Sequence, residues 1–260
     1  MFALSKDKTK VSKSAKRTTN SLFASLGTTD TSNIISAFTN TVFSVVTPAA
    51  SSGASAPKTA KITNIRHLEN LSAAISGYSS NAFGPDKPSS YEQTVDLSWS
   101  DFCEAIAVLT GKPAGNTKVY ALDGSSSAAH TFMPVDGSAN TLTYNGNSRK
   151  ISDVEVSNAS DAGLFATLTG GSVSNLELVN FKVATTGGNA GTLAGTASGA
   201  TLTNILAHDT ASSTSYGVTA SNNAGGLVGS LTGGSVTGCA AAEYVSGSNG
   251  AAGGRVGTAS

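Results

Sequence analysis

The sequence predicts a mainly β protein, a parallel β-helix (β-solenoid) with an N-terminal α-helical cap and a disordered leader. Three observations predict this class. Ser, Thr and Gly make up 99 of the 260 residues, and small or β-branched residues favour turns and strands over helices. Only 12% of the residues are charged, compared with roughly 25% in an average soluble domain. From about residue 140 onward, an apolar pattern repeats too regularly for a disordered chain.

Residues 1–59 are expected to be the disordered leader or linker. Six of the first 20 residues are basic and one is acidic, and a Pro/Ala/Ser/Gly stretch follows at 47–57. A short helix is expected near 34–46. The basic start fits part of a secretion signal, a solvated tail or a segment that touches anionic polymers, and these alternatives stay open. No run of 18 apolar residues is present, so no membrane-spanning helix is expected.

Residues 60–118 are expected to form the helical cap. Apolar residues spaced by three and four positions predict one helix from about 66 to 76 and another from about 99 to 109, with a short strand at 94–97. The positions that define the two apolar stripes are Ile65, Leu68, Leu71 and Ile75, and then Phe102, Ile106 and Leu109. Each stripe has to be buried, and the first turn of the β-helix is the nearest available surface. The helices are therefore expected to cover its open end.

Residues 119–260 are expected to hold short strands at 119–122 and 131–135 and then the β-helix repeats. The repeat is defined by four anchor leucines: Leu142, Leu164, Leu193 and Leu227. Successive anchors are 22, 29 and 34 residues apart, and Arg255, at the anchor position of the incomplete fifth copy, follows 28 residues later. Apolar residues recur nine positions after each anchor, at Ile151, Val173, Leu202 and Val236. They recur again three positions further on, at Val154, Leu176, Ile205 and Cys239. The unequal distances place insertion loops at 185–189, 210–223 and 246–251.

Equal offsets mean that these side chains stack in an interior column, because each turn pairs in parallel with the next at about 4.8 Å. Asn175 and Asn204 share one offset, where Asp153 and Gly238 stand in the first and last copies. An asparagine at such a position suits either an internal ladder or a left-handed corner. The sequence leaves both open.

The repeats resemble those of bacterial surface proteins with the Gly-Leu-hydrophobic-Gly (GLUG) motif. The motif is visible at Gly163-Leu164-Phe165-Ala166 and at Gly226-Leu227-Val228-Gly229, and the upstream segments 62–71, 93–99 and 132–135 are also similar to that group. The resemblance covers roughly residues 60–260. It implies a right-handed β-helix in a secreted or cell-surface protein, commonly an adhesin. This sequence departs from the pattern in a shifted copy at Leu193-Ala194-Gly195 and in Arg255 at the fifth anchor. It also lacks a closing cell-wall sorting signal, which suggests a fragment that continues into further repeats.

The search for chemistry predicts no catalytic, cofactor-binding or metal-binding residues. The charged residues of 160–260 are not expected to gather in one cleft: Asp161, Glu177, Lys182, Asp209, Glu243 and Arg255. Asp123, Asp136 and Asp153 form the best remaining trio, but two of them precede Gly, which marks turns. His67, His130 and His208 lack metal-ligand spacing, and His67 is expected on the exposed side of its helix. Trp99 is expected in the core or cap, Gly111-Lys112 is followed by proline and is no phosphate loop, and Cys103 and Cys239 are expected to be buried thiols.

The sequence thus favours a non-catalytic module of the bacterial cell surface, adhesin-like or stalk-like, outside the cell. It would bind a protein or glycan on a host or neighbouring cell through the solenoid face and its loops. Zero net charge and the lack of a basic patch in the folded part argue against nucleic acid. Two alternatives remain. A polysaccharide-active enzyme would need three or more charged groups converging within about 6 Å, and an ice-binding solenoid would need a flat ladder of threonines. Thr141, Thr143, Thr201, Thr203 and Thr237 hint at such a ladder.

Overall fold

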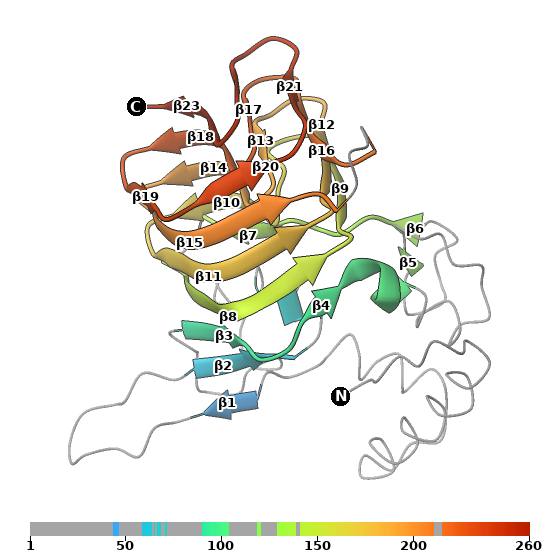
Figure 1. Ribbon diagram of the computed structural model, residues 1–260, viewed down its shortest axis with the longest axis vertical. Helices are drawn as coiled ribbons and strands as arrows, with labels where there is room; N and C mark the ends of the chain where they lie inside the picture. The colour runs from blue at the N-terminus through green and yellow to red at the C-terminus, as the bar shows by residue number, and fades with distance from the viewer. Residues whose placement is uncertain are drawn as a thin grey trace.

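The described part of the chain is mainly β, and its strands stack along one direction to form parallel sheets (Figure 1). The computed structural model describes residues 59–63, 65, 67, 68, 71, 90–103, 131–138, 141–210 and 215–260, and the backbone alone of 44–46, 119–120 and 129–130. Short strands follow one another along the chain, and each pairs with the strand that holds the equivalent place in the neighbouring repeat. None of the helices in the described residues is long and apolar enough to cross a membrane.

The largest sheet has nine strands, and all of its pairs are parallel except β1 with β2. Its path runs through β1 (Ser44–Val46), β2 (Thr59–Ile62), β3 (Ser90–Gln93), β8 (Thr143–Ser152), β11 (Ser172–Val179), β15 (Thr201–His208) and β19 (Ser235–Thr237). Two short strands lie off this path, β4 (Leu97–Ser98) beside β8 and β20 (Ala240–Ala242) beside β15. The sheet therefore joins segments from the whole described chain.

Three smaller parallel sheets complete each repeat. One consists of β7 (Val135–Gly137), β10 (Phe165–Thr169), β14 (Ala194–Ser198), β18 (Val228–Thr232) and β23 (Val256–Ala259). The second consists of β9 (Glu155–Asn158), β12 (Lys182–Thr185), β16 (Gly217–Ala220) and β21 (Val245–Gly247). The third consists of β13 (Ala190–Gly191), β17 (Ala224–Gly225) and β22 (Ala252–Gly253). β5 (Val119–Tyr120) and β6 (Ala129–His130) pair antiparallel apart from these.

The predicted stacking is confirmed for the later repeats. Val173 pairs with Leu202 and Leu202 with Val236, while Leu176 pairs with Ile205. The residues expected to point inward are buried, except Val236, which is partly buried and packs against the core. The equal offsets therefore predict the interior column correctly for the repeats that start at Leu164, Leu193 and Leu227.

The predicted register of the first repeat is wrong. Val173 pairs with Tyr144 and not with Ile151, and Ile151 pairs with Leu178. Val135, expected to precede the repeats, starts the first one by pairing with Phe165. The register of β8 against β11 shifts between Ser174 and Leu176, so extra residues there move Ile151 along the coil. Leu142 and Ile151 are both buried, so the apolar pattern of this segment fits both the predicted and the observed register.

The N-terminal segments also differ from expectation. Within the predicted helical cap, strands β2 and β3 extend the large parallel sheet. Of the strand expected at 94–97 only Leu97 is in a strand, because β4 is Leu97–Ser98 and residues 94–96 belong to no strand. The expected helix at 34–46 lies mostly outside the described residues, and its last three residues form β1 beside β2. Helical residues are present at 65, 67, 68, 71 and 99–103. The predicted loop at 210–223 contains strand β16.

One continuous core runs through these elements. The apolar residues of the helical segments join it, since Ile65, Leu68, Leu71, Trp99 and Cys103 are all buried in the same cluster as the repeat aliphatics. Burial of Ile65, Leu68 and Leu71 is what the spacing of the first stripe predicted. In the second stripe Phe102 is only partly buried, and Ile106 and Leu109 lie outside the described residues. Whether the helices act as a cap stays a prediction.

Candidate binding surface

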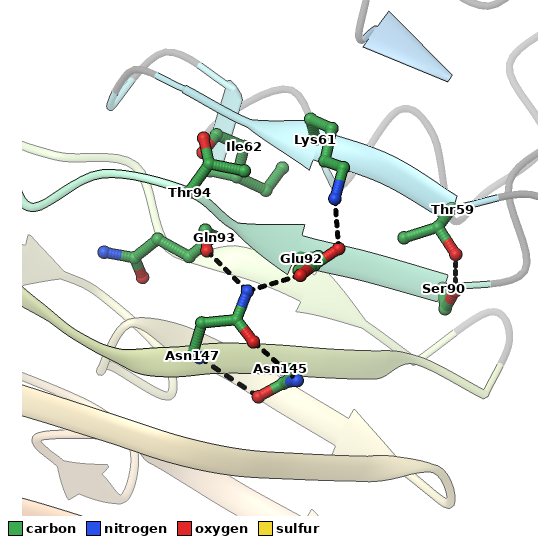
Figure 2. A network of polar contacts seen from close by, with 9 residues as sticks. All are labelled: Thr59, Lys61, Ile62, Ser90, Glu92, Gln93, Thr94, Asn145 and Asn147. Carbon is green, nitrogen blue, oxygen red and sulfur yellow. Dashed lines mark hydrogen bonds and ion pairs between the residues drawn. The ribbon is translucent and has the colours of Figure 1, made fainter. Parts of the chain in front are cut away.

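The outer face of the nine-stranded sheet carries a column of hydroxyl side chains. Side chains alternate between the two faces of a strand, and buried Tyr144, Val173 and Leu202 lie between outward positions. The hydroxyl residues form cross-strand pairs: Thr59 with Ser90, Thr143 with Ser172, Ser172 with Thr201, and Thr201 with Ser235. At the N-terminal end, the hydroxyl oxygens of Thr59 and Ser90 are 2.8 Å apart, as Figure 2 shows.

The five-stranded sheet carries two such columns, two residues apart along each strand. The first joins Thr167, Thr196, Ser230 and Thr258, and the second joins Thr169, Ser198 and Thr232. The Ser260 hydroxyl continues the second column, 3.4 Å from the Thr232 hydroxyl. Thr169, Ser198 and Thr232 are exposed, whereas Thr167, Thr196 and Ser230 are half-buried. This face is therefore regular and rich in groups that both donate and accept hydrogen bonds. Two carboxylates adjoin it, since Asp136 pairs with Thr167 and Asp161 accepts from the Thr196 hydroxyl.

Beside the hydroxyl column of the nine-stranded sheet runs a ladder of asparagines. Asn204 Nδ2 donates to Asn175 Oδ1 at 3.2 Å, and Asn175 Nδ2 donates to Asn145 Oδ1 at 3.1 Å. Asn175 and Asn204 also have φ angles of 53° and 54°. The left-handed corner is therefore confirmed, whereas the ladder lies at the surface and not in the interior, since Asn204 is exposed and Asn175 is half-buried.

The ladder ends in a network on β2, β3 and β8 (Figure 2). Asn145 Nδ2 donates to Asn147 Oδ1 at 2.9 Å, and Asn147 Nδ2 donates to Glu92 Oε1 at 2.6 Å. The other carboxylate oxygen of Glu92 accepts from the Lys61 ammonium. These hydrogen bonds from Lys61 and Asn147 hold the pKa of Glu92 below its ordinary value, so its carboxylate is ionised.

A second polar group lies where the large sheet turns toward the four-stranded sheet. His208 Nε2 and Glu177 Oε1 are 2.8 Å apart. His208 pairs with Ala242 in the next coil. Asp209 and Glu243 are the residues that follow these two along the chain, so they occupy equivalent positions in neighbouring coils. Asp209 raises the pKa of Glu243 through charge repulsion, so the two carboxyl groups are within electrostatic range. The structure thus brings together Asp209 and Glu243, which both lie 16 residues after an anchor leucine, so the expectation that the charged residues of 160–260 do not gather is wrong for this pair.

Glu243 is the most perturbed carboxyl group of this corner. Burial raises its pKa to about 8, the hydrogen bond from Thr192 opposes that rise, and Asp209 adds to it. The Thr192 hydroxyl donates to Glu243 Oε1, while Glu243 Oε2 and Asp209 Oδ1 are buried without a hydrogen-bond partner. Burial also raises the pKa of Asp209, and His208 lowers it. Glu243 is therefore neutral up to about pH 8, whereas an ordinary glutamate ionises near pH 4.5.

The other acidic residues singled out by sequence have structural partners. Asp153 accepts from Asn180 Nδ2 at 3.1 Å, and Asp161 accepts from the Asn189 backbone amide at 2.8 Å. Lys182 pairs with Glu155 at 3.2 Å, and Asp136 accepts from the Ser138 amide at 3.0 Å. The trio of Asp123, Asp136 and Asp153 stays untested as a site, since Asp123 lies outside the described residues. No cluster that could hold a metal ion occurs within the described residues.

The remaining candidates have mixed outcomes. Trp99 is fully buried and packs edge-on against Phe132, with ring centroids 5.4 Å apart, as expected for a core anchor. Cys103 and Cys239 are buried free thiols, as expected. The prediction for His67 is wrong, because it is buried and its Nδ1 accepts from the Thr63 amide at 3.1 Å. Burial lowers the pKa of His67 to about 4. His130 lies in strand β6, Lys112 lies outside the described residues, and Arg255 lies between β22 and β23.

Sequence reasoning missed the two polar groups described above, namely the Lys61–Glu92–Asn147 network and the Asp209–Glu243 corner. The corner had a sequence signal, because Asp209 and Glu243 each lie 16 residues after an anchor leucine, Leu193 and Leu227. The network had no signal in the repeat, because β2 and β3 lie in the segment expected to be helical.

Comparison with known proteins identifies no family. No family model and no curated protein matches this chain. Among solved structures, the chain is similar to the crystal structure described as a "putative immunoglobulin A1 protease" from Bacteroides ovatus, with 16% sequence identity and a TM-score of 0.45. The likeness covers 80% of this chain and 63% of that chain.

Proposed function

We propose that this chain is a non-catalytic module of a bacterial surface protein, adhesin-like or stalk-like, that binds a ligand outside the cell. In this proposal its parallel sheets wind as a right-handed β-helix, since successive parallel strands in one sheet are connected almost always with that hand. The ligand is a protein or glycan on a host or neighbouring cell. The resemblance of the repeats to GLUG-type surface proteins supports this setting.

The single observation that carries the proposal is the pair of hydroxyl columns on the five-stranded sheet. Strands β10, β14 and β18 each place hydroxyl groups at the same two positions, and β23 adds Thr258 at the first. The outer column is exposed on β10, β14 and β18. A rigid face of this kind offers many weak hydrogen bonds at fixed spacing, which suits a polyhydroxylated or repetitive ligand. The lack of charged side chains at these positions disfavours anionic polymers such as nucleic acid.

Binding of the purified full chain to a printed glycan array and to a mucin-coated surface tests this proposal. The double variant Ser198→Lys/Thr232→Lys places two ammonium groups in the outer column and should weaken binding at least about tenfold, since each displaced contact costs on the order of 1 kcal/mol. The matched control is Ser157→Lys/Thr219→Lys, which alters exposed positions on the four-stranded sheet. Equal loss in both variants, or no binding of the unaltered chain to either surface, would contradict the proposal.

An ice-binding role is a second candidate, and the same columns favour it. Of the threonines noted in the sequence, Thr143, Thr201, Thr203 and Thr237 lie on the nine-stranded sheet, but serines interrupt the column there. On the five-stranded sheet, hydroxyls two residues apart repeat on β10, β14 and β18, with a strand spacing of about 4.8 Å. Measurable thermal hysteresis that disappears in Ser198→Lys/Thr232→Lys would favour this role over ligand binding.

A polysaccharide-active enzyme is the third candidate, favoured by the Asp209–Glu243 corner. A neutral carboxyl beside a second carboxyl is the pairing that glycoside hydrolysis uses. The Glu243 carboxyl, however, is mostly buried and bonded to interior Thr192, so the non-catalytic role is preferred. Release of reducing ends from pectin, xylan or chitin that is lost in Glu243→Gln would overturn that preference.

A further inference from the structure

Three neighbouring strands bring a lysine, a glutamate and an asparagine into one hydrogen-bonded group, in which the asparagine lies two residues beyond Asn145, the residue that the register pairs with Glu92 (Figure 2). Lys61 on β2 stands directly opposite Glu92 on β3 in the parallel register, and Asn147 lies on β8, the next strand. The Lys61 ammonium donates to Glu92 Oε2, and Asn147 Nδ2 donates to Glu92 Oε1 at 2.6 Å. One carboxylate therefore bridges an amine and a carboxamide.

The Asn147 carboxamide is held by contacts on every side. Its Nδ2 also donates to the backbone oxygen of Gln93 at 2.9 Å, and its Oδ1 accepts from Asn145 Nδ2 at 2.9 Å. Its backbone amide donates to Asn145 Oδ1 at 3.0 Å, and its φ of 53° turns the chain at this point. A hydrogen bond to Oδ1 draws electron density from Cγ, and a hydrogen bond from Nδ2 to a carboxylate prepares that nitrogen for protonation.

We propose that Lys61 and Asn147 form an intramolecular isopeptide bond, with Glu92 as the group that moves the protons. The proposal rests on this geometry and does not depend on the proposed binding function. It makes this network a self-modification site, and its substrate is the chain itself.

The reaction balances without an external reagent. The Lys61 ammonium transfers one proton to Glu92, and its neutral Nζ attacks Cγ of Asn147. Glu92 passes a proton to Nδ2 and takes a second proton from Nζ, the bond between Cγ and Nδ2 breaks, and ammonia leaves. The ammonia then takes the last proton from Glu92 and departs as ammonium. One C–N bond forms, one C–N bond breaks, nothing is oxidised, and Glu92 ends as a carboxylate.

The fixed geometry lowers the activation barrier of an otherwise slow reaction. Amines do not attack amides in dilute solution, but holding both groups on a rigid sheet replaces an encounter with a high effective concentration. The side chains of Lys61 and Glu92 are 28% and 31% exposed, so the departing ammonium has a path to solvent. The ion pair is the resting state, and the neutral amine forms by proton transfer within the hydrogen bond.

The bond would link β2 to β8 across β3 and close a covalent loop around the N-terminal strands. These strands are the first of the large sheet, where a pulling force or a protease would begin to open it. Closing a long loop lowers the entropy of the unfolded chain, so the linked protein should be more stable than the unlinked one.

Intact-mass spectrometry of the full chain tests the proposal. The unaltered protein should be about 17 Da lighter than its sequence mass, the mass of one ammonia released per bond formed. Tandem mass spectrometry of a tryptic digest should show a branched peptide in which Lys61 is joined to Asn147 and is not cleaved. Glu92→Gln should retain the full mass and the unaltered circular dichroism spectrum, and should melt at a lower temperature.

The matched controls are Lys61→Arg and Lys182→Arg. Lys182 also pairs with a glutamate, Glu155, but Glu155 has no asparagine carboxamide bonded to it in the described residues. Lys182→Arg should therefore keep the mass loss, and Lys61→Arg should abolish it. A full sequence mass for the unaltered protein would overturn the proposal. A loss that persists in Lys61→Arg would also overturn it, because it would identify cyclisation of Asn147 on its own backbone.

Discussion

Asn204 donates a side-chain hydrogen bond to Asn175 in the coil before it, with Nδ2 and Oδ1 3.2 Å apart. Both residues have left-handed φ angles, 53° for Asn175 and 54° for Asn204. Asparagine suits this position for two reasons, since it tolerates the left-handed region and its amide can donate and accept along the stack. The same ladder continues through Asn145 to Asn147 and Glu92.

Substitution of Asn175 separates these two contributions. Asn175→Ala removes both ladder bonds and leaves a strained backbone, so the free energy of unfolding should fall by about 2–3 kcal/mol. Asn175→Gly removes the same bonds without the strain and should lose about 1 kcal/mol less. Urea denaturation monitored by circular dichroism measures both. An equal loss in the two variants would show that backbone strain plays no part.

Leu168 and Leu231 occupy the same coil position, on either side of Ala197. Leu168 is 2% exposed, whereas Leu231 is only partly buried. Leu168→Ala should therefore destabilise the protein by about 2–5 kcal/mol, and Leu231→Ala by roughly half as much, because less apolar area and a smaller cavity are involved. Thermal melts of the two variants provide the comparison, and a larger effect at Leu231 would contradict the burial difference.

Gly171 and Gly233 both have left-handed backbones, with φ of 70° and 62°. A Cβ at Gly171 would lie 2.0 Å from the backbone oxygen of Leu142, whereas nothing lies within 4 Å of a Cβ at Gly233. Gly233→Ala should cost about 1 kcal/mol from conformational strain alone. Gly171→Ala should cost several times that amount, because two neighbouring coils must move apart. Soluble expression and urea midpoints measure the contrast, and similar midpoints would show that the coils can separate freely.

Because the pKa of Glu243 is raised in the folded state, we expect the free energy of unfolding to decrease as the pH rises. Its pKa is raised from 4.5 to about 8 in the folded state, chiefly by burial. Between these two values the folded chain keeps a proton that the unfolded chain releases, so the free energy of unfolding falls with increasing pH. The stabilising contribution is complete below pH 4.5 and is lost as the pH passes through about 8.

Glu243→Gln provides the control for this pH dependence. A glutamine carries no titrating proton, so the difference between the two unfolding curves isolates the contribution of Glu243 from that of His67 and other groups. Urea unfolding at a series of pH values should give a variant curve that is flatter from pH 5 to 8. A variant with the same slope as the unaltered protein would show that Glu243 titrates normally.

The sequence could predict much of the coil stack but only part of the candidate surface. The offsets from Leu164, Leu193 and Leu227 placed Val173, Leu202 and Val236 in one column, and strand pairing confirms it. The same offsets failed for Ile151, since a register shift in β8 displaces it. The hydroxyl columns follow from the alternation once the register is known, so they were visible only as a hint in the scattered threonines.

The sequence by itself determined that the chain is mainly β, which residues form the interior of the later coils, and that asparagine occupies a shared position. These properties are local or strictly periodic, so spacing is enough to reveal them. The tertiary structure alone decided that Lys61, Glu92 and Asn147 meet on adjacent strands and that the Glu243 carboxyl bonds to the buried Thr192. Contacts between residues 31 or 55 positions apart depend on the length of every intervening loop. A parallel register fixes those contacts only after the neighbouring strand is in place.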